Sequence, residues 1–74
     1  MKGRSLSTRI GLAVRQRRES LGVRQEDVAK KLKMHRTYYG AIERGQKNVR
    51  LETLERICAV LKISMWEVMQ DAEE

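Results

Sequence analysis

Apolar side chains recur along the chain at spacings of three and four residues, the period of an α-helix with one buried face. The first such stretch predicts a helix over residues 6–21, from Leu6, Ile10, Ala13, Val14 and Leu21. Ser5 or Ser7 suits the start of this helix, because a hydroxyl accepts hydrogen bonds from the free amides of a first turn. Gly22 suits its end, where a left-handed residue is common.

The same spacing predicts three more helices, at residues 25–32, 36–44 and 51–61. A fifth helix is expected in a short segment opened by Ser64. The short segment begins Ser-Met-Trp-Glu, the pattern of a capping box in which a hydroxyl and a carboxylate each bind a free amide. No stretch alternates between apolar and polar residues. The prediction is therefore an all-α fold, a compact five-helix single domain spanning residues 1–74.

The predicted helices 25–32 and 36–44 are joined by only three or four residues, which is the arrangement of a helix-turn-helix. Two helices that cross steeply need a small residue at their closest point, and Ala29 supplies it. Val28, Leu32, Met34, Tyr39 and Ile42 would lock the pair onto the first helix. The other face of segment 36–44 is then free to project into the major groove of DNA.

Charge is distributed unevenly along the 74 residues, whose formal net charge is +6. Residues 1–50 contain 14 Lys and Arg against four acids, a balance of +10, whereas residues 51–74 contain two against six, a balance of −4. A strongly positive region favours nucleic acid, because neutralising phosphates releases counterions. The alternative on charge alone is a solvated basic face without a partner.

Several classes of protein are excluded by what the chain lacks. With one His and one Cys, it has no cluster with metal-ligand spacing, no internal disulfide and no catalytic constellation, so we expect no enzyme activity, no metal and no cofactor. Cys58 is expected to fill the core. The longest apolar run, ICAVL, is far shorter than the roughly twenty residues that span a bilayer. No signal peptide follows Met1, so we expect a cytoplasmic protein without membrane association.

The segment QEDVAKKLKMHRTYYGAIERG resembles the helix-turn-helix of the Cro/repressor-type transcription regulators. Their pattern runs Q-E-x-[LV]-A, then a turn, then R-[ST]-Y-[IV]-x-x-[IV]-E-x-G. The flanks are similar too, and the resemblance covers residues 8–69. HRTYY followed by IERGQKNV is similar to controller proteins of restriction–modification systems and to some phage and mobile-element regulators. The resemblance implies a lambda-repressor-like fold and sequence-specific binding of double-stranded DNA.

The resemblance also implies roles for individual residues. A structural ion pair is expected between Arg18 and Glu43. The residues expected to meet or approach base edges are His35, Arg36, Thr37, Gly40 and Ala41, with Arg36 suited to the two acceptors of guanine. The residues expected to hold phosphates are Gln25, through its side chain or amide, and Arg44, Gln46, Lys47 and Asn48.

For three aromatic or imidazole side chains, a purely structural role is the alternative to a contact with DNA. His35 stands where the family often carries a serine, so it can simply cap its helix. Tyr38 and Tyr39 are expected to pack rather than to stack on bases.

Three residues depart from the family's pattern. Lys33 stands where the turn usually has Gly, so a left-handed backbone there would cost roughly 1 kcal/mol. Arg24 and Arg50 stand where Ser or Thr often caps the next helix, and each lost cap costs about 1 kcal/mol. Both arginines add positive charge beside the expected DNA face.

The C-terminal segment, about residues 62–72, is expected to form a dimer interface. It carries more apolar side chains than one short helix can bury, and its expected contacts are Met65, Trp66 and Met69. The alternative is that Trp66 folds inward over the monomer core. A homodimer would place two recognition helices on a palindromic operator, about 34 Å apart. Regulation would then follow from occupancy, either by blocking RNA polymerase or by contacting it.

A second function from a different class keeps the fold but changes the partner. In that alternative the chain is a protein-interaction module, such as an antitoxin or an anti-repressor partner. It predicts weak, salt-sensitive DNA binding and a tight protein complex. The charge of +10 over residues 1–50 argues against it.

Overall fold

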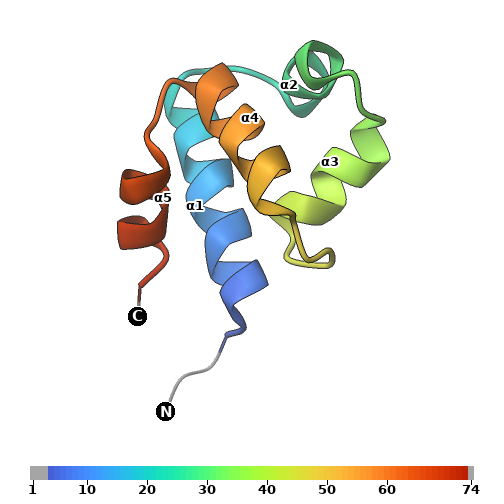
Figure 1. Ribbon diagram of the computed structural model, residues 1–74. Helices are drawn as coiled ribbons and strands as arrows, with labels where there is room; N and C mark the ends of the chain where they lie inside the picture. The colour runs from blue at the N-terminus through green and yellow to red at the C-terminus, as the bar shows by residue number, and fades with distance from the viewer. Residues whose placement is uncertain (1–3, 74) are drawn as a thin grey trace.

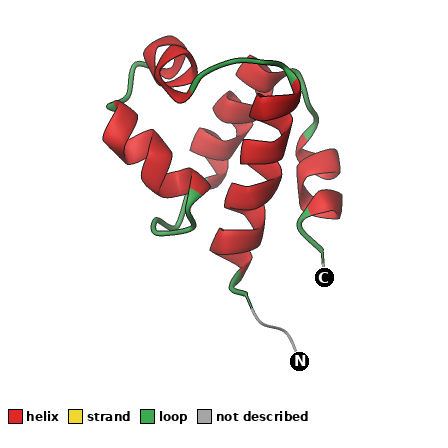
Figure 2. Cartoon of the chain, turned by 180° about the vertical axis from the view of Figure 1, so that it is seen from behind, coloured by secondary structure: helices red, strands yellow, loops and turns green. Residues whose placement is uncertain are grey.

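The computed structural model describes residues 4–73, and within them it contains five helices and no strand (Figures 1 and 2). The ends of the predicted domain, residues 1–3 and 74, lie outside the described residues. The predicted all-α, five-helix fold is confirmed, with boundaries that differ by one residue at two helix ends. The helices are α1 (Leu6–Ser20), α2 (Gln25–Leu32), α3 (Arg36–Glu43), α4 (Leu51–Leu61) and α5 (Met65–Asp71).

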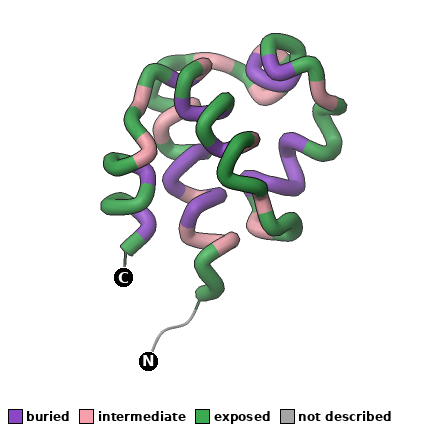
Figure 3. Tube along the Cα trace, in the orientation of Figure 1, coloured by how far each residue is buried: buried purple, intermediate pink, exposed green. Residues whose placement is uncertain are grey.

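Helix α1 lies at the centre of the molecule and packs against α3, α4 and α5, while α2 packs against α3 and α4. The buried residues lie on the inner faces of the five helices (Figure 3), where they form one aliphatic core. Tyr39 is the aromatic side chain within this core. The fully buried large side chains are Val14, Val28, Tyr39, Ile42, Leu54, Ile57, Leu61 and Val68. None of the described helices is long and apolar enough to cross a membrane.

The helix boundaries follow the local signals in the sequence. The Ser5 hydroxyl accepts from the amide of Thr8, and Gly22 has the expected left-handed backbone. The Ser64 hydroxyl accepts from the Glu67 amide while the Glu67 carboxylate accepts from the Ser64 amide, so the predicted capping box is formed. Lys33 does adopt φ 57°, the strained conformation expected of it.

Arginine side chains donate hydrogen bonds to carbonyl groups at the C-terminal ends of three helices. The sequence did not predict these contacts. Arg17 donates to the carbonyls of Leu61 and Lys62, at 2.9 and 2.8 Å. Arg9 donates to the Ala72 carbonyl after α5, and Arg56 donates to the Leu32 carbonyl that ends α2. A helix C-terminus carries partial negative charge, so these cations stabilise the fold. Part of the positive charge of α1 is therefore structural.

Gly11 allows α1 to approach the end of α3 closely. A methyl group at this position would lie 2.5 Å from the carbonyl oxygen of Glu43 and would also collide with that of Ile42. Both are backbone atoms, which cannot rotate away. The absence of a side chain at Gly11 thus sets the position of α3, the helix expected to meet DNA.

Candidate nucleic-acid interface

Helix α3 divides its residues between a buried face and an exposed face. Tyr39, Ile42 and Glu43 are buried against the rest of the protein. Arg36 and Thr37, two of the expected base-reading residues, are exposed at the start of the helix. The side chain of Arg36 has no hydrogen bond or ion pair with any other described residue. A long cation without an intramolecular partner is available for an external acceptor.

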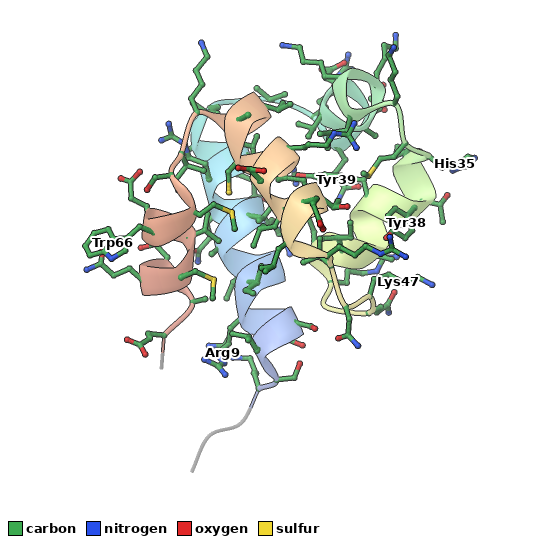
Figure 4. All side chains as sticks on the ribbon, in the orientation of Figure 1. Arg9, His35, Tyr38, Tyr39, Lys47 and Trp66 are labelled. Carbon is green, nitrogen blue, oxygen red and sulfur yellow. The ribbon has the colours of Figure 1, made fainter. Side chains whose placement is uncertain are left out.

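The two neighbouring tyrosines point in opposite directions (Figure 4). Tyr39 enters the core, and burial raises the pKa of its hydroxyl, which makes no hydrogen bond among the described residues. Tyr38 was also expected to pack, but 40% of its surface is exposed, on the outer side of α3 beside Thr37 and Ala41. The helical period alone does not predict this exposure, because Tyr38 lies three residues from Ala41 and four from Ile42, and both of these are buried.

His35 is the N-cap of α3. Its Nδ1 accepts from the Thr37 amide at 3.3 Å, so the capping alternative describes its local role. The ring is nevertheless exposed, at the outer end of the helix (Figure 4). The cap and an external contact are compatible, because the imidazole has a second nitrogen.

A buried polar network fixes the inner end of α3. Arg18 Nε lies 2.7 Å from Glu43 Oε2, Arg18 Nη2 lies 3.1 Å from Oε1, and Gln25 Nε2 donates to Oε1 at 2.9 Å. Arg18 also donates to the Val23 carbonyl. Burial alone would raise the pKa of the Glu43 carboxyl, but the hydrogen bonds from Arg18 and Gln25 outweigh it and hold that pKa below its ordinary value. The network joins α1, α2 and α3 at one carboxylate.

This network limits how Gln25 and Gly40 can contact DNA. The Gln25 side chain is directed inward to Glu43, which leaves its main-chain amide, in the uncapped first turn of α2, for an external anion. Gly40 is buried: a methyl group there would lie 3.4 Å from Gln25 Oε1 and 3.2 Å from Arg44 Nη1. Gly40 therefore lies beneath these side chains, whereas Ala41 lines the outer surface.

The loop after α3 forms an exposed basic and amide-rich edge. Arg44 donates to the Gln46 side chain at 3.2 Å, and Lys47 has no partner among the described residues. Asn48 accepts from the Ser7 hydroxyl at 2.7 Å, which ties the loop to α1. These four residues, expected to hold phosphates, thus lie together beside the exposed face of α3.

A second exposed surface is apolar and belongs to α1, α4 and α5. Trp66 is 70% exposed and Leu51 71%, and the inward alternative for Trp66 does not occur. Leu6 and Met69 line both of the adjoining hollows that contain Trp66 and Leu51, so the four side chains form one continuous apolar surface. Met65, also expected at the dimer interface, is partly buried and packs against the core, with Sδ 3.8 Å from Cys58 Sγ. Figure 4 shows Trp66 and His35 on opposite sides of the molecule.

Among residues 4–73, no group of three or more His, Cys, Asp or Glu side chains is placed to hold a metal ion. Cys58 is a buried free cysteine, and burial raises the pKa of its thiol. Two exposed surfaces are therefore candidates for binding a partner: the exposed face of α3 with its basic edge, and the apolar surface.

Comparison with known proteins places these features in context. Residues 14–66 match the protein family described as helix-turn-helix. The chain is 41% identical over 58 residues to the control protein C.MunI of Mycoplasma sp, an alignment that covers 78% of each chain.

Two solved structures are similar over nearly the whole chain. The clp gene regulator ClgR from Corynebacterium glutamicum superposes with a TM-score of 0.92 at 30% identity, over 96% of this chain and 76% of that one. The restriction-modification controller protein C.Esp1396I, as a tetramer in complex with its natural 35 base-pair operator, gives 0.82 at 28% identity, over 95% of this chain and 92% of that one.

Proposed function

The chain belongs to the helix-turn-helix family of DNA-binding transcription regulators, and from this premise we propose that it binds a palindromic operator as a homodimer. The observation that carries the proposal is the division of α3. Its buried face is locked by Glu43, while Arg36, Thr37 and Tyr38 are exposed beside a basic loop. The similarity to C.MunI and C.Esp1396I supports a role in controlling a restriction–modification system or the regulator's own gene.

In this proposal the exposed residues divide between base recognition and phosphate binding. Arg36 donates two parallel hydrogen bonds to guanine, with His35, Thr37 and Ala41 beside it at the base edges. Gly40 acts indirectly, because its lack of a side chain leaves room for the side chains of Gln25 and Arg44. The amide of Gln25 and the edge formed by Arg44, Gln46, Lys47 and Asn48 bind phosphates and fix the register.

The apolar surface of Leu6, Leu51, Trp66 and Met69 is the proposed dimer contact, so the segment 62–72 contributes Trp66 and Met69 to it. Exposed Trp and Met side chains on one continuous surface are typical of interfaces. Trp66 lies on the opposite side of the molecule from His35, so a dimer contact centred on Trp66 leaves the start of α3 open to DNA (Figure 4). An occupied operator would block RNA polymerase or, upstream of a promoter, permit contact with it.

The first test is selection from a random duplex library by the purified protein at about 150 mM salt. A palindrome with half-sites about 10 bp apart would support a dimeric, sequence-specific regulator. Recovery of only bulk, salt-sensitive binding would refute it and favour the protein-interaction alternative.

Two variants then separate base recognition from phosphate binding. Arg36→Ala should relax preference at one base pair by about 1–3 kcal/mol, while Lys47→Ala should weaken all sequences alike and reduce the salt slope by about 1. Equal losses on operator and random DNA for Arg36→Ala would exclude a base contact.

The dimer contact is tested by sedimentation. Trp66→Glu should shift the protein to monomer and weaken operator binding, because it places a charge in the apolar surface. Ala59→Glu, which adds the same charge at an exposed position of α4, is the matched control. Dimers that persist unchanged in Trp66→Glu would contradict this interface.

A further inference from the structure

The outer side of α3 carries an open hollow of about 450 Å³. Its lining consists of His35, Thr37, Tyr38, Ala41 and Lys47. Ala41 is only 6% exposed and forms the floor, whereas the Tyr38 ring stands beside it with no hydrogen bond to any described residue. Figure 4 shows His35, Tyr38 and Lys47 along this outer side, with Tyr39 directed away from it.

The hollow combines an apolar floor with a polar rim. The floor consists of the Ala41 methyl and the Tyr38 ring, and the spacing of three residues places them on one helical face. The rim carries donors. Lys47 is a donor only, and the Nδ1 of His35 already accepts from the Thr37 amide, so the neutral ring bears its proton on Nε2.

The edges of base pairs in the major groove offer one apolar group, the 5-methyl of thymine, which lies next to the O4 acceptor. An apolar floor fits the methyl, and a rim of donors fits O4. Cytosine carries a donor, N4, where thymine carries O4, so 5-methylcytosine would match the floor and oppose the rim.

We propose that this hollow recognises the 5-methyl edge of a thymine in each operator half-site. Ala41 and the Tyr38 ring contact the methyl group, and the donors of Lys47 and His35 face O4. The inference rests on the proposed function, because it requires that the outer side of α3 enter the major groove. It adds Tyr38 to the residues that determine specificity and gives Ala41 a defined contact.

The experiment replaces the thymines of the selected operator by uracil, one position per half-site at a time, and measures dissociation constants. Uracil lacks only the methyl group, so one position should weaken binding about fourfold per half-site, the effect expected for burying one methyl. At that position, paired with guanine, 5-methylcytosine should bind more weakly than thymine.

Variants connect the effect to the hollow. Tyr38→Ala should abolish the difference between thymine and uracil, and Tyr38→Phe, which keeps the ring and loses the hydroxyl, should preserve it. The uracil substitutions act on the DNA alone and need no altered protein, so they decide the question even if Tyr38→Ala does not fold.

Each contrary outcome is distinct. Selective operator binding that no uracil substitution weakens would overturn this inference and leave the proposed function standing. Equal binding of 5-methylcytosine and thymine would overturn the choice of thymine by showing that the methyl is recognised without O4. Failure to select any sequence would overturn both the proposed function and this inference.

Discussion

Replacing Glu43 tests the central claim that one buried carboxylate holds α3 in place. The side chain is 1% exposed, and its partner Arg18 is 11% exposed, so either single substitution leaves a buried charge without its counterpart. Breaking such a pair typically costs about 3–5 kcal/mol. A domain of this size has a free energy of unfolding of about 4–11 kcal/mol, so Glu43→Leu should remove a large part of it.

The double variant decides whether the loss reflects the pair or the sites separately. Replacing both partners, as Arg18→Met with Glu43→Leu, removes both charges, so its loss should be at least about 2 kcal/mol smaller than the sum of the single losses. Urea unfolding followed by far-ultraviolet circular dichroism at pH 7 measures all four proteins. Losses that add within about 0.5 kcal/mol would refute the reasoning, because additivity means that the two residues do not interact.

The same carboxylate predicts a pH dependence of definite sign. Its pKa in the folded protein is lower than its ordinary value, about 4.3. Its stabilisation is therefore present above that value and is lost as the pH falls through the folded pKa. Glu43→Gln should flatten this acid limb, and Glu55→Gln, at an exposed position of α4 with no ion pair among the described residues, is the matched control. Parallel limbs for the wild type and Glu43→Gln would contradict the assignment.

Three further substitutions test local features by thermal unfolding. Gly11→Ala should destabilise the protein by about 1–3 kcal/mol through collision with the α3 backbone, although helix propensity alone predicts a gain of about 1 kcal/mol; a higher melting temperature would contradict the close approach. Lys33→Gly should relieve the left-handed strain and raise the melting temperature by about 4–8 °C, and no gain would mean that the turn is unstrained. Ser64→Ala should cost about 1 kcal/mol by removing the capping box, and an unchanged stability would show that α5 does not depend on it.

Local signals predicted most of the fold because each depends on neighbouring residues. The period of the apolar positions identified four helices, the capping box at Ser64 identified the fifth, and the left-handed Gly22 was predicted from residue type and position. The left-handed Lys33 was expected only from the family's pattern, which usually has Gly there. The pairing of Arg18 with Glu43 came from a family resemblance, because spacing alone does not bring α1 to the end of α3.

Long-range contacts were harder to predict, for a physical reason. The need for Gly11 arises from the backbone of α3, which is about thirty residues away in the chain. The inward rotamer of Gln25 depends on the buried carboxylate of Glu43. Arg9 and Arg17 contribute to the same formal charge as Arg36, yet they bind helix ends, so net charge alone cannot identify the cations that are free for DNA.

The arrangement of α3 separates stability from specificity. Its inner side is held by three contacts: the close approach at Gly11, the network at Glu43, and the bond between Ser7 and Asn48 that ties the following loop to α1. Its outer side carries Arg36 and Tyr38, whose side chains form no hydrogen bond among the described residues. Substitutions on an exposed face without such bonds usually change stability by no more than about 0.5 kcal/mol. The outer residues can therefore be exchanged to alter the bound sequence while the helix stays in place, because Gly11 and Glu43, which orient α3, act on its buried side and not on the face that carries Arg36 and Tyr38.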